Sequence, residues 1–121
     1  MILNQVEYLC NLTFSNTTNP TKTQVENEIT KMKELVKNIL ENRGINLISI
    51  PYEYDRLVAL RVATTILNKD VNMEGFVTYL KNLYEELIKE VFQTMIENYF
   101  VKEKADPDLL KMDWDFEHDH Y

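Results

Sequence analysis

The apolar positions in the last third of the chain repeat every four residues. Adjacent apolar pairs stand at Tyr79/Leu80, Leu83/Tyr84, Leu87/Ile88, Val91/Phe92, Met95/Ile96 and Tyr99/Phe100. Because each residue advances about 100° around an α-helix, a step of four overshoots a full turn by about 40°. Five steps rotate the apolar direction by about 200°, so the two ends of one straight helix would face nearly opposite ways. A small monomer has one core, and the second face therefore needs a kink, a folded-back segment or another copy of the chain.

The rest of the pattern predicts further helices joined by short connectors. We expect helices over residues 3–12, between an N-cap at Thr21 and a stop at Gly44, over residues 53–68 and over about 73–102. Thr21 is a good N-cap with Gln24 in capping-box spacing, and Gly44 supplies the stop of the second helix. Residues 13–20 are predicted to form a loop, since their Ser, Thr and Asn side chains compete for backbone hydrogen bonds. Residues 45–50 are β-rich but too short for a sheet, and we interpret them as an extended connector or a strand that pairs with a neighbour.

The third predicted helix is apolar nearly all round, which is typical of a central helix. Arg56 and Arg61 interrupt it, and we expect both to extend to solvent or to pair with acids of the fourth helix. The alternative is that one of them contacts a partner subunit or nucleic acid. Two glycines and three prolines in 121 residues favour long helices over a turn-rich β fold. The predicted fold is all-α, a small bundle of about four helices with a long C-terminal helix. Residues 1–104 form its single domain, followed by an extended C-terminal tail of residues 105–121.

The C-terminal tail combines aromatic and acidic residues in strict alternation. Met112, Trp114, Phe116, His118 and His120 share one parity, and Asp113, Asp115, Glu117 and Asp119 share the other. In an extended chain these two sets would lie on opposite sides. Disordered segments are poor in aromatic residues, so we interpret the tail as a docking segment that buries Trp114 and Phe116, in its own domain or in a neighbour. His118 and His120 alone cannot complete a structural zinc site, and no metal is predicted.

The net charge of −7 lies entirely in the second part of the chain. Residues 1–72 hold eight basic and eight acidic side chains, whereas residues 73–121 hold five lysines and twelve acids. Binding to duplex DNA by counterion release needs clustered Lys and Arg, so no sequence-specific nucleic-acid partner is expected. No apolar run approaches the roughly 18 residues of a membrane span, and the N-terminus lacks the pattern of a signal peptide. We therefore expect no membrane partner.

The sequence carries no recognisable catalytic chemistry. It lacks a glycine-rich phosphate loop, a Cys-x-x-Cys pair, a Gly-x-Ser-x-Gly elbow and a His-Glu-x-x-His helix. The single cysteine, Cys10, has helical spacing to Val6 and is interpreted as a small buried hydrophobe rather than a nucleophile. We predict that the protein is not an enzyme and has no cofactor. Contacts with partners are predicted instead at Tyr84, Phe92, Ile96, Tyr99, Phe100, Trp114, Phe116 and Tyr121.

The layout resembles the head–tail connector (adaptor) proteins of tailed viruses and prophages over roughly residues 3–100. The resemblance rests on the short first helix, on the polar loop and Asn19–Ile29 opening an amphipathic helix, and on the alanine-bearing segment Leu57–Thr64. It implies a small helical protein that assembles as a ring, commonly of twelve copies, beneath the portal. Such a ring joins the portal to a tail or stopper protein and leaves a channel for DNA. The expected location is the virion, and the host cytoplasm during assembly.

A small metal-assisted enzyme is a remaining alternative, against which a lack of bound metal after purification would count. Two other, non-catalytic functions fit the same sequence. An acidic inhibitor, for example a DNA mimic or a host-defence antagonist, would need its charges on one surface at near-phosphate spacing and would run as a monomer or dimer. A helical regulatory module would use the C-terminal tail as a peptide switch. Both share with the connector hypothesis the absence of catalysis and a role in binding other proteins.

Overall fold

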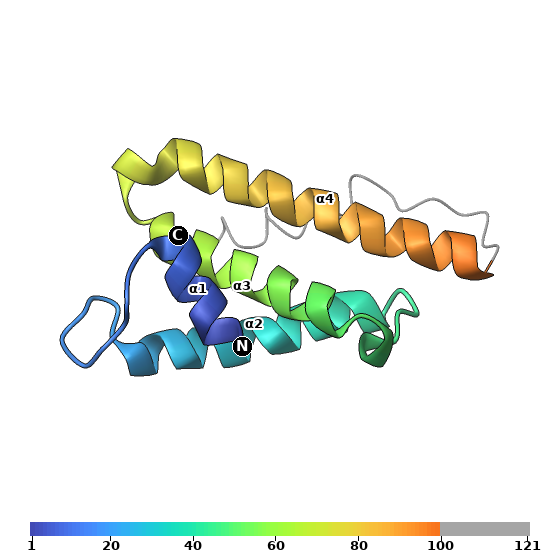
Figure 1. Cartoon of the computed structure of the whole chain (residues 1–121), viewed down its shortest axis with the longest axis horizontal. Coiled ribbons are helices and arrows are strands. Elements are labelled where there is room, and N and C mark those ends of the chain that lie inside the picture. The colour runs from blue at the N-terminus through green and yellow to red at the C-terminus, as the bar shows by residue number, and fades with distance from the viewer. Residues whose placement is uncertain (100–121) are drawn as a thin grey trace. The chain divides into compact units, whose positions relative to one another are not determined.

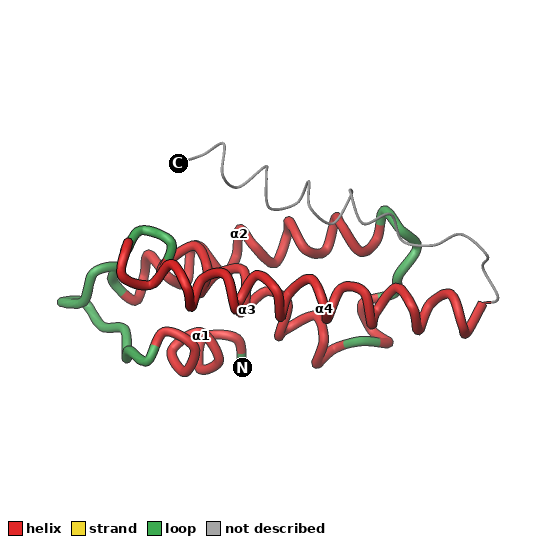
Figure 2. Tube along the Cα trace, turned by 90° about the horizontal axis from the view of Figure 1, so that it is seen from above, coloured by secondary structure: helices red, strands yellow, loops and turns green. Residues whose placement is uncertain are grey.

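The computed structural model describes the backbone of residues 1–99 and the side chains of residues 1–93 (Figure 1). The elements are α1 (Ile2–Cys10), α2 (Lys22–Glu41), a 3₁₀ turn η1 (Leu47–Ser49), α3 (Pro51–Leu67), a second 3₁₀ turn η2 (Val71–Met73) and α4 (Glu74–Tyr99). Within these residues the protein is all-helical, without a strand (Figure 2). The predicted domain boundary at residue 104 and the extended C-terminal tail lie outside the described residues.

The chain divides into two compact units, Met1–Tyr84 and Glu85–Tyr121, and the division falls inside α4. In the first unit α3 packs against both α1 and α2 (Figure 1). Eight consecutive residues of α3, Leu57–Thr64, are buried. Successive helical residues point in different directions about 100° apart, so an unbroken buried run means that α3 is covered on every side. The prediction that this helix is central is therefore confirmed.

The boundaries of α2 follow from its side chains as predicted. The Thr21 N–H donates to Gln24 Oε1 over 2.9 Å and the Gln24 N–H donates to Thr21 Oγ1 over 3.3 Å, so the capping box is complete. After the helix, Gly44 takes a φ of 78°, a left-handed conformation that costs glycine little. The Gly44 N–H donates to the Glu41 carbonyl, which satisfies one of the last carbonyls of the helix.

The loop after α1 is anchored as well as polar. Its Ser and Thr side chains do bond to nearby backbone groups, as predicted: Thr18 Oγ1 accepts from the Ser15 N–H and donates to the Pro20 carbonyl. In addition Phe14 is buried, and its N–H donates to the Glu7 carboxylate over 2.9 Å. Burial of one phenylalanine contributes on the order of 2 kcal/mol and ties the loop to the core.

The connector between α2 and α3 differs from the extended conformation that its β-rich sequence predicted. Residues 47–49 form the turn η1, in which Asn46 Oδ1 accepts from the Ile48 N–H and the Ser49 hydroxyl donates to the Asn46 carbonyl. These local side-chain bonds outweigh the β-propensity of three isoleucines and a leucine. Pro51 then begins α3, because a proline at the first helical position loses no hydrogen bond and has a suitable φ.

Arg61 is fully buried in the middle of α3, so the predicted extension of its side chain to solvent is wrong. Its guanidinium carbon lies 5.0 Å from the centroid of the Tyr84 ring of α4. An aromatic face attracts a cation, most strongly where water is excluded, by about 2 kcal/mol. The contact therefore helps to hold the first part of α4, residues 74–84, against α3.

Replacing Tyr84 with leucine keeps an apolar side chain but removes the ring over the buried Arg61. We expect Tyr84→Leu to lower the free energy of unfolding by about 2 kcal/mol or more, measured by urea denaturation followed by circular dichroism. Tyr52→Leu is the matched control, since Tyr52 is 84% exposed and should change stability by less than about 0.5 kcal/mol. Equal effects of the two substitutions would contradict a structural role for the Arg61–Tyr84 contact.

Candidate functional site

Among the described side chains of α4, residues 74–93, the apolar stripe is only partly covered, and an exposed part lies at the start of the helix. The buried side chains described in α4 are Val77, Leu80, Tyr84, Ile88, Val91 and Phe92. At about 100° per residue these six fall within a sector of about 120°, which is one ordinary helix face. Tyr79 lies about 100° from Leu80, and it is 54% exposed while Leu80 is fully buried. Leu80 stands at one edge of the buried sector, so Tyr79 falls about 100° outside it and stays in contact with water.

Tyr79 belongs to a shallow groove of about 720 Å³ between α1 and the start of α4, with Arg56 of α3 on its border. The groove lies within the first compact unit. Its lining residues are Met1, Asn4, Gln5, Tyr8, Leu9, Asn11, Arg56, Phe76, Tyr79 and Leu83. We call this surface the α1–α4 groove.

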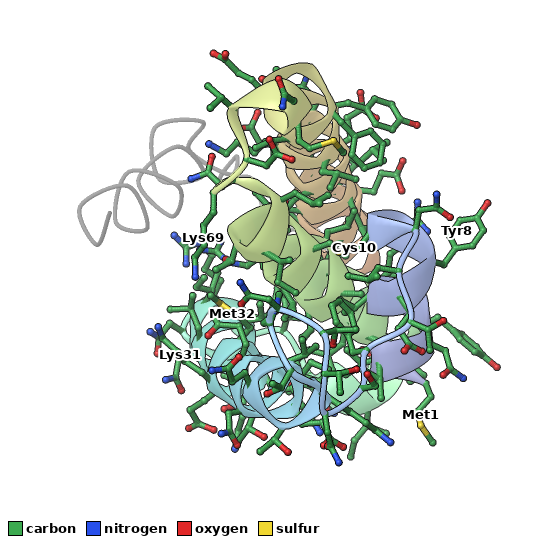
Figure 3. The ribbon with its side chains drawn as sticks, turned by 90° about the vertical axis from the view of Figure 1, so that its left-hand side faces the viewer. Met1, Tyr8, Cys10, Lys31, Met32 and Lys69 are labelled. Atoms are coloured by element: carbon green, nitrogen blue, oxygen red, sulfur yellow. The ribbon has the colours of Figure 1, made fainter. Side chains whose placement is uncertain are left out.

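Three aromatic rings dominate the α1–α4 groove. Tyr8 is 86% exposed and Phe76 is 36% exposed, and the Phe76 and Tyr79 ring centroids are 6.0 Å apart. Figure 3 shows Met1 and Tyr8 projecting outward from α1. Tyr8 projects outward because the apolar stripe of α1, with Ile2 and Val6 buried, faces the other way. A cluster of exposed aromatic side chains is the usual composition of a protein contact surface.

The charge of the groove is positive and comes from one side chain. Among the described residues that line it, the exposed Arg56 is the only one with a charged side chain, and Asn4, Gln5 and Asn11 supply amide donors and acceptors. A second hollow of about 570 Å³, near the end of α3, is lined by both signs of charge, with Lys69 beside Asp70 and Glu28. The α1–α4 groove therefore has the more distinctive chemistry, with aromatic walls and one exposed guanidinium.

The described residues offer little for catalysis or metal binding. No group of three or more His, Cys, Asp or Glu side chains among them could hold a metal ion. None of the helices in this part of the chain is long and apolar enough to cross a membrane. Cys10 is half-buried, and burial raises the pKa of its thiol from the ordinary 9.0 to about 11. A thiol with a raised pKa holds its proton at neutral pH and is a poor nucleophile.

The residues predicted to contact partners are spread over several environments. Tyr84 is 1% exposed and packs on Arg61, and Phe92 is 2% exposed. The side chains of Ile96 and Tyr99 are outside the described set, and so are residues Phe100, Trp114, Phe116 and Tyr121. Their role as an interface stays a prediction. Tyr8 and Phe76 were missed, although a tyrosine opposite the apolar stripe of a short helix is a signal that could have identified the groove.

The raised pKa of Cys10 can be tested by alkylation with iodoacetamide. The thiolate reacts, so at pH 9 a thiol with a pKa of about 11 should react roughly fifty-fold more slowly than one with a pKa of 9.0. We expect this ratio between the native chain and the chain unfolded in urea, with free cysteine as the calibrating control. Equal rates in the two states would contradict the burial of Cys10 and reopen a nucleophilic role.

No family model, curated protein or solved structure matches the chain. The resemblance to head–tail connector proteins accordingly stays a prediction from the sequence pattern, and the α1–α4 groove is the described feature on which a function can be argued.

Proposed function

We propose that this protein is a non-catalytic structural subunit that assembles with copies of itself into a ring and serves as a head–tail connector. In this role the ring lies beneath a portal, contacts a tail or stopper protein and leaves a channel for DNA. The observation that carries the proposal is the exposed aromatic surface of the α1–α4 groove, where Tyr8, Phe76 and Tyr79 lie together. The resemblance of the sequence to head–tail connector proteins suggests which kind of assembly this is.

The exposed aromatic side chains support assembly because they lie close together on one surface. Single apolar side chains on a surface are ordinary and need no explanation. Here three aromatic rings and the 87% exposed Met1 border the same groove. Transfer of such side chains from water into a contact is favourable by about 25 cal/mol per Å² of apolar area, and aromatic residues dominate the energy of protein interfaces. A neighbouring chain would gain this energy by covering the groove.

A ring needs two different surfaces on each subunit. When one surface of a subunit binds a different surface of the next subunit, the same contact is repeated from copy to copy. The assembly closes into a ring when the rotation between neighbouring subunits is a whole-number fraction of a full turn. The α1–α4 groove supplies one such surface on the first unit. The second surface must come from elsewhere on the chain, and the aromatic residues of the C-terminal tail are the candidate that the sequence offers. The acids that give residues 73–121 a charge of −7 would favour the passage of DNA through a channel without adhesion.

Assembly of the full-length chain tests this proposal directly. We expect light scattering after gel filtration to show a concentration-dependent assembly, and negative-stain images, alone or with the portal protein encoded nearby, to show rings. Tyr8→Ser combined with Tyr79→Ser should raise the apparent dissociation constant about a hundredfold, because each ring is expected to contribute more than 1 kcal/mol.

The matched control is Tyr52→Ser, which removes a tyrosine that is about as exposed as Tyr8 but lies outside the α1–α4 groove. It should leave assembly unchanged, and circular dichroism should show the same helix content in all three chains. A wild-type chain that stays monomeric at every concentration and forms no ring with the portal would overturn the proposed function.

A further inference from the structure

The α1–α4 groove combines features that together select a particular ligand chemistry. Its walls carry the rings of Tyr8, Phe76 and Tyr79, its charged side chain is Arg56, and its remaining polar groups are amides. Aromatic walls favour aromatic or large apolar side chains. A guanidinium favours carboxylates, and side-chain amides can bond to the backbone of a bound peptide. The expected occupant is a peptide that alternates aromatic and acidic residues.

Such a peptide occurs in this chain at residues 112–119. Trp114 and Phe116 alternate with Asp113, Asp115 and Glu117, and no basic Lys or Arg follows Lys111. Deepening the proposed function and resting on it, we propose that the α1–α4 groove of one copy binds residues 112–119 of a second copy. This contact joins consecutive subunits of the ring. It combines the positive, aromatic groove of the first unit with a negative, aromatic segment outside the described residues.

The spacing of the side chains suits this pairing. Alternate residues of an extended peptide lie about 6.6 Å apart, which is the separation between Trp114 and Phe116 along such a segment. The Phe76 and Tyr79 ring centroids of the groove are 6.0 Å apart. Two neighbouring aromatic side chains of the peptide can therefore each pack on one ring of α4. The carboxylates then lie on the other side of the peptide backbone, and the positive charge of Arg56, the charged side chain of the groove lining, attracts this acidic segment electrostatically.

The source of the peptide is a second copy rather than an unrelated partner. Complementarity of charge and of aromatic content is already present within one sequence, so identical chains carry both the donor and the acceptor surface. Because the tail segment and the groove are different surfaces, each copy can bind the next one in the same direction, which is the arrangement that a ring requires. Docking of the segment on its own chain would instead saturate the groove and leave single copies.

Trp114 provides a direct reporter, since it is the only tryptophan in the chain. We expect its fluorescence emission to shift to shorter wavelength as the concentration of the full-length protein increases, in step with assembly. Tyr8→Ser combined with Tyr79→Ser should abolish the shift, Arg56→Glu should require about tenfold more protein, and Tyr52→Ser should behave as the wild type. Added salt should reduce the shift at a given protein concentration, because it screens the attraction between the carboxylates of the tail and the guanidinium of Arg56.

A complementation experiment identifies the donor. The groove variant carries Tyr8→Ser and Tyr79→Ser, and the tail variant carries Trp114→Ser and Phe116→Ser, both in the full-length chain. Each alone should stay monomeric, whereas an equimolar mixture should form a heterodimer, since one intact groove meets one intact segment. Binding of a synthetic peptide of residues 109–121 to the tail variant, and not to the groove variant, should follow the same pattern, with a scrambled peptide as control.

The outcomes separate this inference from the proposed function. If the wild type forms rings but the two variants do so equally well, the groove–tail contact is wrong and the ring proposal stands. A Trp114 shift that is independent of concentration would show docking within one chain and would also overturn the inference. A tail variant that binds neither the peptide nor the groove variant would contradict it directly. Failure of the wild type itself to assemble would overturn the proposed function.

Discussion

The structure depends on the need to cover α3 on every side. An α-helix with eight consecutive buried residues has no face for water, and Arg61 among them places a charge where only close partners can stabilise it. α1 and α2 cover α3 from two directions, and the first part of α4 brings Tyr84 over the guanidinium. Each of these helices turns its own apolar stripe inward to do so. The outer surfaces of α1 and α4 are what remains.

The α1–α4 groove is a consequence of this arrangement. The buried side chains of α4 occupy one sector of the helix with Leu80 at its edge, so Tyr79, about 100° beyond that edge, stays outside while Leu80 is buried. Tyr8 stays outside for a related reason, since it lies opposite the stripe of α1. The rings of Tyr8 and Tyr79 thus form an exposed aromatic surface. We propose that assembly covers this surface.

Local signals in the sequence predicted much of the fold. The capping box of Thr21, the stop at Gly44 and the central helix rich in apolar residues are each specified by a few neighbouring residues, so they could be identified without coordinates. The burial of Arg61 and Phe14 could not, because it depends on contacts between distant segments. The α1–α4 groove could not be predicted from the sequence either, because it also depends on contacts between distant segments. The four-residue repeat predicted that some apolar side chains would remain uncovered, but the exposure of Tyr79 rather than Leu80 depends on where α3 lies.

The central claim is that the aromatic surface of the α1–α4 groove is covered when copies of the chain assemble. Hydroxyl-radical footprinting of the full-length protein, read by mass spectrometry at Tyr8, Tyr79 and Tyr52 across a concentration series, tests it most directly. The account predicts that oxidation of Tyr8 and Tyr79 falls several-fold as the assembly forms, while oxidation of Tyr52, which is about as exposed as Tyr8 and lies outside the groove, stays constant. Unchanged oxidation of Tyr8 and Tyr79 in the assembled protein would contradict it.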